Sequence, residues 1–227
     1  MRTYRKSRTP CRHEYDGEYR DDRIFIVACD DRYAPEQYFS FFRIPRVKVV
    51  IVPTEDCTSH ARYVLERLLA HEHEVFDELW MLLDTDHCIQ DGHFRAFKEA
   101  LSEARRRKIK VALSRPCFEF WLALHAFSKE EVLECHWETA EEVERALSAR
   151  LGHGYNKTNL RKEDYVASLS NAVRLAREID ETVAGGYRPV GNTTRVYRLW
   201  DSLMKGMSPK QRAELPECLR TIAADCD

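Results

Sequence analysis

The sequence predicts an α/β protein with a mostly parallel sheet of four strands, flanked by helices and followed by a C-terminal helical layer. Three observations predict this fold. Apolar runs of strand length alternate with segments of helical spacing across residues 23–128. After residue 128 the strand signals fade and helical patterns follow one another. The chain has 227 residues, 44% of them hydrophobic and 33% charged, so it can bury a sizeable core beneath a charged surface.

The four strands are expected where short runs rich in aliphatic and β-branched residues stop at a polar residue or a proline. These runs are RIFIVAC, RVKVVIV, ELWMLLD and IKVALS, at residues 23–29, 46–52, 78–84 and 109–114. Helical segments separate them. The connections are therefore expected to be right-handed crossovers between parallel strands.

Helices are expected between and after these strands. Residues 57–74 have helical apolar spacing, and Thr58 or Ser59 can serve as the N-cap. Residues 116–127 begin with a proline in the first turn and are apolar nearly all round, which predicts a buried helix. The full set is 34–42, 57–74, 92–108 and 116–127.

These patterns divide the chain into three regions. Residues 1–22 are polar and are expected to form an arm or to be disordered, residues 23–128 form the α/β core, and residues 129–227 form a helical region packed on the core. In the last region the helices are expected at residues 138–152, 158–184 and 192–207, with a loop at 185–192.

Composition and charge exclude several classes of protein. The net charge of −2 gives no global attraction to nucleic acid, so such binding needs local basic patches. No apolar run reaches the ~20 residues of a membrane span and no secretory signal is recognisable, so we predict a cytoplasmic protein without membrane contact. The eight cysteines are scattered and are expected to be reduced thiols. The His and Cys residues lack structural-zinc spacing, including His71, His73, His87, Cys88 and His93.

Two of the predicted strands end in carboxylates. Asp84 closes one strand, and Asp86 points in the same direction while the chain stays extended. Asp30 and Asp31 close another strand. Ligands of parallel α/β sheets bind at the carboxyl ends of the strands, where these acids meet if the two strands are neighbours. Carboxylates that lie close together repel one another, and a bound Mg²⁺, or Mn²⁺ as a substitute, relieves this repulsion. Asp84, Asp86 and Asp30 are therefore predicted metal ligands. The alternative is that these acids form plain turns or helix caps.

A further acid, Glu119, lies in a segment otherwise suited to full burial. Lone acids seldom occupy such helices without a partner. Because Ser114 ends a strand, the helix that follows starts at the edge where the aspartates lie. Glu119 can reach the metal, directly or through a water, or pair with an arginine. His125, six residues later, lies on another helical face and is expected to be a core histidine.

The chain resembles the RloB-like proteins, a family of bacterial phage-defence proteins with a Toprim-type α/β core. The family pattern Cys-Glu-Gly-x-x-Thr-Glu-Pro-x-Tyr-Phe corresponds to CDDRYAPEQYF at residues 29–39. The family Asp-x-Asp corresponds to DTD at 84–86, and Ser-Asn-Pro-Cys-Phe-Glu-x-Trp-Leu-x-Leu-His to SRPCFEFWLALH at 114–125. Tyr155 and Lys157 match a Tyr-x-Lys motif.

A late family element, Pro-x-x-x-Thr followed by a helix, is similar to PVGNTTRVYRL at residues 189–199. The resemblance spans about residues 23–205, and its most specific part is PCFEFWLALH. It implies a Toprim active site, in which a glutamate after the first strand is the general acid/base and the Asp-x-Asp holds Mg²⁺. It also implies metal-assisted cleavage of phosphodiesters in DNA or RNA, with an ATPase of the ABC/SMC-like class as partner.

The first motif departs from the family pattern. Asp30 stands in place of the glutamate and is one methylene shorter, while Asp31 replaces a glycine and Ala34-Pro35 replace Thr-Glu. Proton transfer demands hydrogen-bond reach, so a shorter carboxylate matters. Asp30 or Asp31 can do the work through a shifted backbone, the enzyme can be weakened, or the site can be dead.

Basic residues supply the candidate nucleic-acid contacts. Lys157 is expected to face phosphate, with Arg161 and Lys162 beside it and Tyr155 able to stack on a base; a solvated loop is the alternative. The basic run at residues 104–110 is read as a helix end that complements the helix dipole. If that run binds anything, nucleic acid is the first expectation.

Two functions therefore compete. The first is an Mg²⁺-dependent Toprim nuclease of an anti-phage system, with Asp30, Asp84, Asp86 and Glu119 in the catalytic site and DNA or RNA, including tRNA, as substrate. The second is a weakened or inactive sensor or adaptor that binds nucleic acid or a partner ATPase. The altered Asp30-Asp31 pair favours the adaptor, and the intact Asp-x-Asp favours the nuclease. Both functions are compatible with a homo-oligomer.

Overall fold

In the computed structural model, residues 22–54, 60–86 and 94–224 are described in full. The N-terminal region adds the backbone of three short strands, β1 (Tyr4–Arg5), β2 (Arg12–Tyr15) and β3 (Glu18–Arg20). They pair antiparallel in a sheet of their own. The patterns of residues 1–22 gave no strand signal, because polar residues dominate there.

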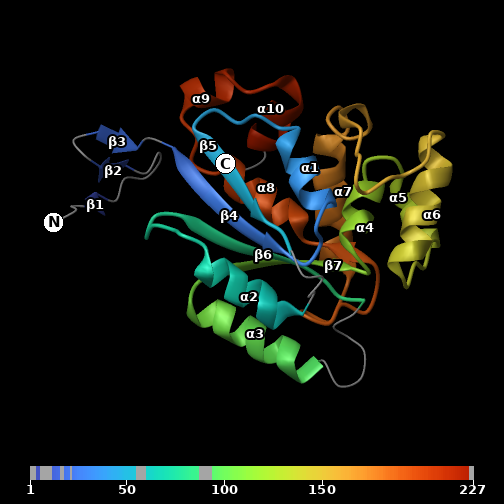
Figure 1. The fold of residues 1–227 in the computed structure, drawn as a ribbon. Helices are drawn as coiled ribbons and strands as arrows, with labels where there is room; N and C mark the ends of the chain where they lie inside the picture. Colours follow the sequence, from blue (N-terminus) through green and yellow to red (C-terminus); the bar gives the residue numbers. More distant parts are fainter. Residues whose placement is uncertain are drawn as a thin grey trace.

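The main sheet has five strands in the order β5-β4-β6-β7-β8 (Figure 1). β4 (Arg23–Cys29), β5 (Val47–Val52), β6 (Glu78–Asp84) and β7 (Lys110–Arg115) are parallel and confirm the predicted strands. The predicted number of four is wrong, because β8 (Thr193–Thr194) pairs antiparallel with the end of β7. Two residues are too few to show a strand pattern, and a helix was expected there.

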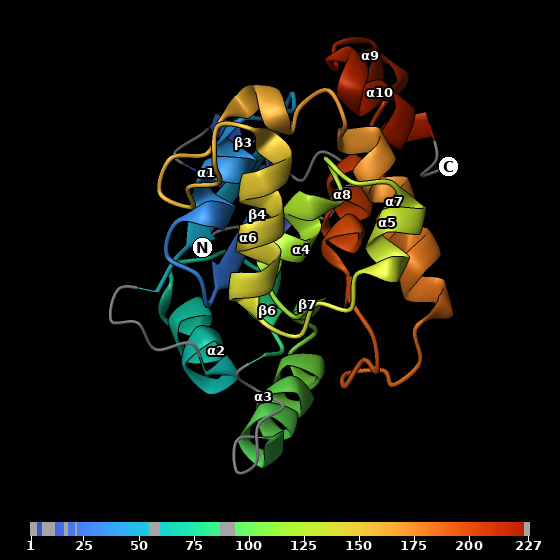
Figure 2. The same cartoon turned by 90° about the vertical axis from the view of Figure 1, so that its right-hand side faces the viewer.

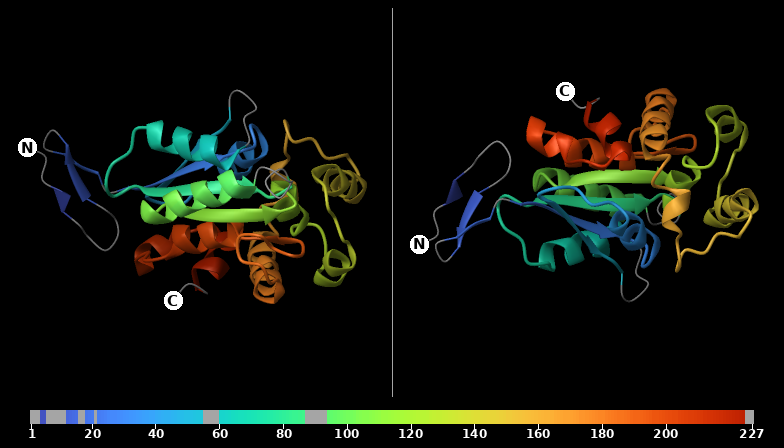
Figure 3. Two further views of the ribbon diagram at one scale, coloured as in Figure 1. Left: turned by 90° about the horizontal axis from the view of Figure 1, so that it is seen from below. Right: turned by 90° about the horizontal axis from the view of Figure 1, so that it is seen from above.

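Helices cover both faces of this sheet (Figure 3). Strand side chains alternate between the faces, so Phe25 joins one hydrophobic cluster and Ile26 the other. The cluster around Ile26 is closed by α2 (Ala61–Ala70) and α3 (Phe94–Arg106). The cluster around Phe25 is larger. It is closed by α1 (Ala34–Ser40), α4 (Phe118–Ala123), α7 (Leu169–Thr182), α8 (Val196–Met204) and α10 (Glu217–Ala224).

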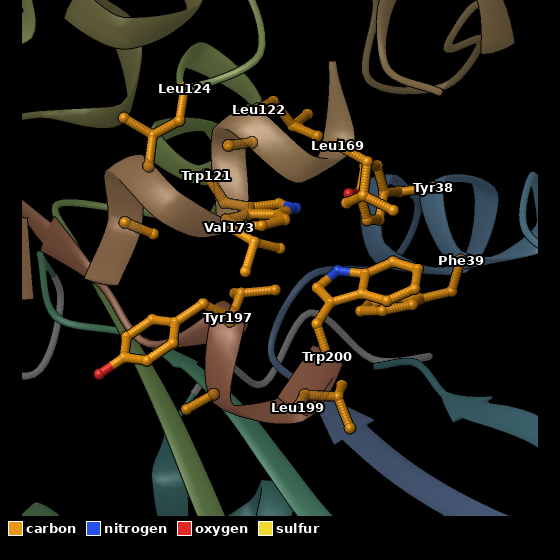
Figure 4. Packing of buried hydrophobic residues seen from close by; sticks show 14 of the residues in the cluster. Tyr38, Phe39, Trp121, Leu122, Leu124, Leu169, Val173, Tyr197, Leu199 and Trp200 are labelled. Atoms are coloured by element: carbon orange, nitrogen blue, oxygen red, sulfur yellow. The ribbon is translucent and has the colours of Figure 1, made fainter. Parts of the chain in front are cut away.

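Aromatic side chains form the centre of the larger cluster (Figure 4). Trp121 of α4 and Trp200 of α8 are fully buried. The ring of Tyr38 from α1 lies edge-on to both, with centroid distances of 6.0 and 6.3 Å, and Phe39 stacks on Trp200 at 5.7 Å. Truncating a buried aromatic of this size costs about 3–5 kcal/mol. This cluster therefore joins α1, α4 and α8 into one layer.

The helix expected over residues 158–184 is wrong in its first part. That part contains only a 3-10 turn, η1 (Lys162–Asp164), and α7 starts at Leu169. The Leu160 N–H donates to Oε1 of Gln37 on α1, at 2.9 Å, which holds this segment against α1. A contact across 123 residues leaves no local signal in the sequence.

The other helices follow the patterns with shorter bounds. α6 (Ala140–Leu151) is as expected and starts with a capping box between Thr139 and Glu142. α5 (Lys129–Glu134) and α9 (Pro209–Ala213) were not predicted, as each is only one or two turns long, and α10 was missed as well. The predicted caps Thr58 and Ser59 lie outside the described residues. Within the described residues, none of the helices combines the length and apolar character that crossing a bilayer requires.

A buried carboxylate joins the last elements of the chain. Asp180, near the end of α7, is 8% exposed and accepts hydrogen bonds from Arg195, Tyr197 and Arg198 at 2.9, 3.0 and 2.7 Å. Thr193 of β8 donates a longer bond of 3.4 Å to the same group. Burial raises the pKa of Asp180, but Arg195, Tyr197 and Arg198 together hold it below its usual value. The charged carboxylate thus connects α7, β8 and α8.

Candidate functional site

The carboxyl ends of β4 and β6 bring two of the predicted acids together. The strands are neighbours, with Cys29 of β4 opposite Leu82 of β6. Oδ2 of Asp30 accepts a hydrogen bond from the backbone N–H of Asp84 at 2.8 Å. Figure 2 views this edge of the sheet, with α4 and α6 nearby. The expectation that these two strand ends meet is confirmed.

The acids at this edge disturb one another electrostatically. Burial raises the pKa of Asp30 to about 7, helped by the charges of Asp31 and Asp86 and opposed by backbone hydrogen bonds. Burial, then Asp30, Glu119, Asp86 and Asp31, raise the pKa of Asp84 well above its usual value. Both side chains are partly open to solvent, although protein atoms crowd around them. Negative charge is therefore costly at this edge.

Asp31 has a structural task that separates it from Asp30. Its Oδ1 accepts hydrogen bonds from the backbone N–H groups of Tyr33 and Ala34, at 2.5 and 2.8 Å. These groups lie at the start of α1, where N–H donors have no partner within the helix. Of the two adjacent aspartates, Asp30 is therefore the one that faces Asp84, while Asp31 holds the turn that leads into α1, whose N-cap residue is Tyr33.

The turn that carries Asp86 is held by the start of α4. The carbonyl oxygen of Pro116 accepts hydrogen bonds from the backbone N–H groups of Thr85 and Asp86, at 3.0 and 3.2 Å. The bond between Arg115 and Pro116 is cis. The Thr85 N–H also reaches the carbonyl oxygen of Ser114 at 3.0 Å. The Asp-x-Asp segment and the PCFEFW segment are thus one connected unit.

Glu119 lies in the first turn of α4 and is only 3% exposed. Its partner is a tyrosine: the hydroxyl of Tyr155 donates to Oε1 of Glu119 at 3.0 Å. Within the described part of the chain Glu119 forms no ion pair, so the arginine pairing that the sequence left open does not occur there. Burial, followed by the charge of Asp31, raises the pKa of Glu119. Burial also raises the pKa of Tyr155.

Two of the three predicted nucleic-acid residues, Tyr155 and Lys157, lie close to this group. Lys157 is near the acids: burial lowers its pKa, but the carboxylates of Glu144, Glu119 and Asp31 outweigh this and raise it. Its Nζ is 3.7 Å from Oε1 of Glu144. Because the Tyr155 hydroxyl is directed at Glu119, its stacking role stays a prediction. Arg161 is exposed to solvent.

A family model described as RloB-like protein matches residues 25–203. The chain belongs to the RloB-like family. No curated protein and no solved structure matches the chain. The matched part of this RloB-like protein begins within β4 and ends within α8, so it includes the acids, Tyr155, Lys157 and the Asp180 network. The resemblance read from the sequence is confirmed at the level of the family.

The donor set of this RloB-like protein suits a hard divalent cation. Carboxylate oxygens are the ligands that Mg²⁺ prefers, and a cation among them would relieve the repulsion that raises the pKa values of Asp30 and Asp84. No three His, Cys, Asp or Glu side chains of the described residues already surround one point as ligands. Asp84, Asp86, Asp30 and Glu119 would have to turn toward a bound ion. In the structure Oδ2 of Asp30 instead accepts a hydrogen bond from the backbone N–H of Asp84.

One cation near the site was not predicted. Nη2 of Arg67 on α2 donates to the carbonyl oxygen of Cys29 at 3.0 Å, directly before Asp30. Its charge also opposes the rise in the Cys29 pKa that burial and Asp30 cause. The signal available in the sequence was an arginine within the amphipathic segment ARYVLERLLA; the structure adds that it is half-buried. The long reach of its side chain to the end of β4 could not be read from helix periodicity.

Replacing Asp84 with asparagine is expected to stabilise the metal-free protein at neutral pH, because it removes a charge that the folded state disfavours. The melting temperature should rise by about 2–4 °C for each kcal/mol gained. Mg²⁺ should raise the melting temperature of the wild type and lose this effect in Asp84→Asn, since a cation that binds only the folded state stabilises it.

Glu36→Gln, an exposed acid of α1 away from the cluster, is the matched control and should leave the Mg²⁺ response unchanged. An Asp84→Asn protein that melts lower without metal and still responds fully to Mg²⁺ would contradict the assignment.

Proposed function

We propose that this RloB-like protein is a metal-dependent nuclease of the Toprim type, acting as the effector of a bacterial anti-phage defence system. Its substrate would be a phosphodiester in DNA or RNA, with tRNA among the candidates. The observation that carries the proposal is the meeting of Asp30 and Asp84 on neighbouring parallel strands, with Asp86 and Glu119 close enough to shift the pKa of one or both. The family match and the α/β fold support it.

Each residue would have a defined role. Asp84 and Asp86 would hold Mg²⁺ or Mn²⁺, which when bound would supply an activated water and stabilise charge on the phosphate. Asp30 would act as general acid/base or as a further ligand. A carboxyl group with a pKa of about 7 suits proton transfer at neutral pH. Lys157 would bind a phosphate oxygen and Glu119 would support the metal.

A second function has a specific observation in its favour. Asp30 is shorter than the glutamate of the family pattern, and one of its oxygens is occupied by a backbone hydrogen bond. Such a carboxylate reaches less far toward a substrate. On this alternative the protein is a weakened or inactive Toprim-like adaptor that binds nucleic acid or a partner ATPase of the ABC/SMC-like class.

Cleavage assays separate the two functions. Purified wild type, Asp84→Asn and Asp30→Asn would be incubated with plasmid DNA, single-stranded DNA and total tRNA, in Mg²⁺ and then in Mn²⁺. We expect the wild type to cut at least one substrate and each variant to be at least ~100-fold slower, the scale of a lost acid–base group. Glu36→Gln should cut like the wild type.

The same panel would be repeated with the partner ATPase. Absence of cleavage in every condition would reject the nuclease and favour the adaptor. Loss of cleavage in Asp84→Asn alone would remove Asp30 from the catalytic roles.

A further inference from the structure

A second surface, remote from the acids, is strongly basic. It is a groove of about 1160 Å³ at the amino end of β7, between the end of α3 and the α7–α8 pair. Trp80, Ile109 and Val111 line its floor. Ser114, which pairs with Asp84, is four residues beyond Lys110, so about 13 Å of strand separates the groove from the acid cluster.

Cations outnumber acids in this groove. Seven basic side chains of the described residues line it, against one acid, Asp201. The cations are Arg105, Lys108, Lys110, Arg177, Arg195, Arg198 and Lys205. Four of them have acidic partners: Arg195 and Arg198 bind Asp180, Arg177 binds Asp201 and Lys110 binds Glu78.

The remaining three, Arg105, Lys108 and Lys205, have no acidic partner among the described residues, and all are exposed. They come from both walls of the groove, the end of α3 and the end of α8. The predicted helix end is confirmed, because α3 ends at Arg106 with Arg105 and Arg106 in its last turn. Arg106 and Arg107 also pair with Glu103. Arg105 and Lys108 have no such acidic partner among the residues that the structure describes.

An exposed aromatic ring stands at the same groove. Tyr187 lines it and is 47% exposed. The loop that carries Tyr187 is turned tightly at Gly185, whose φ is +108° and where a Cβ would come within 2.0 Å of the Arg188 carbonyl oxygen. Only glycine fits there, so the backbone holds the tyrosine in place. A half-exposed aromatic ring beside exposed cations without acidic partners suits a ligand that has both charge and flat faces.

We propose that this groove binds a single strand of nucleic acid, with the cations on the phosphates and Tyr187 stacked on a base. Single-strand binders combine these two elements, a positive groove and aromatic platforms. An acidic peptide would satisfy the cations but would have no use for the ring. The inference deepens the proposed nuclease function, on which its link to catalysis rests, because the groove would hold the substrate flanking the acid cluster.

The test measures binding without catalysis. Fluorescence anisotropy would follow a fluorescein-labelled single-stranded oligonucleotide of mixed sequence, in EDTA and over a range of salt concentrations. The variants are Arg105→Glu/Lys205→Glu, which changes both walls, and Tyr187→Ala. Lys48→Glu is the control, an exposed cation on β5 at the opposite edge of the sheet. Far-UV circular dichroism would verify folding of each variant.

We expect the double variant to bind at least ~10-fold more weakly, with a salt slope flatter by about 0.7 for each phosphate group that the protein no longer neutralises. Tyr187→Ala should weaken binding about 10-fold, the scale of one stacked base. Lys48→Glu should bind like the wild type. Equal affinity in all four proteins would overturn the inference. So would equal competition by polyglutamate together with unchanged binding by Tyr187→Ala, which would indicate an acidic peptide instead.

The two proposals fail separately. If the groove variants lose binding in EDTA while no cleavage is found, nucleic-acid binding by the groove is supported and the nuclease function is rejected. If the wild type cuts and the groove variants cut with unchanged KM, the nuclease function is supported and substrate binding by the groove is rejected.

Discussion

Replacing Asp180 with alanine is expected to lower the free energy of unfolding by about 3–5 kcal/mol, the cost of leaving a buried charge without its partner. The side chain of Arg195 is 10% exposed, so its guanidinium cannot turn to water when the carboxylate is removed. Tyr197 and Arg198 lose an acceptor at the same time. Urea denaturation followed by circular dichroism would measure the change.

Glu178→Ala is the matched control for this prediction. It lies on the same helix two residues earlier and pairs with Lys129 and Arg174, but its side chain is 34% exposed. Exposed ion pairs contribute about 0–1 kcal/mol, so a small loss is expected. Equal losses in the two variants would show that burial of the Asp180 network does not decide its contribution.

The second large effect concerns pH. Burial lowers the pKa of His125 from its usual 6.5 to about 3. The folded protein keeps this histidine neutral while the unfolded chain protonates it below pH 6.5. Stability is therefore lost as pH falls from about 6.5 toward 3, by about 1.4 kcal/mol for each pH unit. The surroundings of His125 suit a neutral ring, because each ring nitrogen has a hydroxyl partner that can donate or accept. Nε2 is 3.1 Å from the Tyr38 hydroxyl, and Nδ1 is 3.0 Å from Oγ of Ser168.

Denaturation curves at a series of pH values would test this. His125→Gln removes the titrating group and should flatten the fall in stability below pH 6.5, whatever its stability at pH 7. His136→Gln, at an exposed position, should leave the pH dependence as it is in the wild type. If His125→Gln and the wild type lost stability in parallel, the histidine would not be the group responsible.

The parts of the fold that were predictable carry their own local signal. β4 and β6 are seven-residue apolar runs with clear ends, so their bounds were read correctly from the sequence. β8 and the turn before α7 are set by distant partners. Thr194 of β8 pairs with Ser114, and Leu160 bonds to Gln37. No local pattern distinguishes such segments from a helix.

In the site, too, features with a local signal were predictable and features set by distant partners were not. The meeting of Asp30 and Asp84 followed from strand adjacency and from the rule that ligands bind at carboxyl ends. Glu119 was visible as an acid in an apolar helix, but Tyr155, its partner, lies 36 residues away and was assigned a different task. Asp31 was visible beside Asp30, yet its hydrogen bonds to α1 depend on a backbone turn that residue type alone does not specify.

The short fifth strand has a consequence for the time at which the protein is completed. Ser114 of β7 and Thr194 of β8 share a hydrogen bond of 2.9 Å across 80 residues of chain. On the ribosome, β4 to β7 emerge long before β8 is synthesised, and domains are completed in the order of synthesis. A nascent chain therefore carries every acid of the site while its sheet edge and its helical layer are still unfinished. Under the proposed nuclease function, this order would separate the synthesis of the acids from the completion of the sheet that positions them.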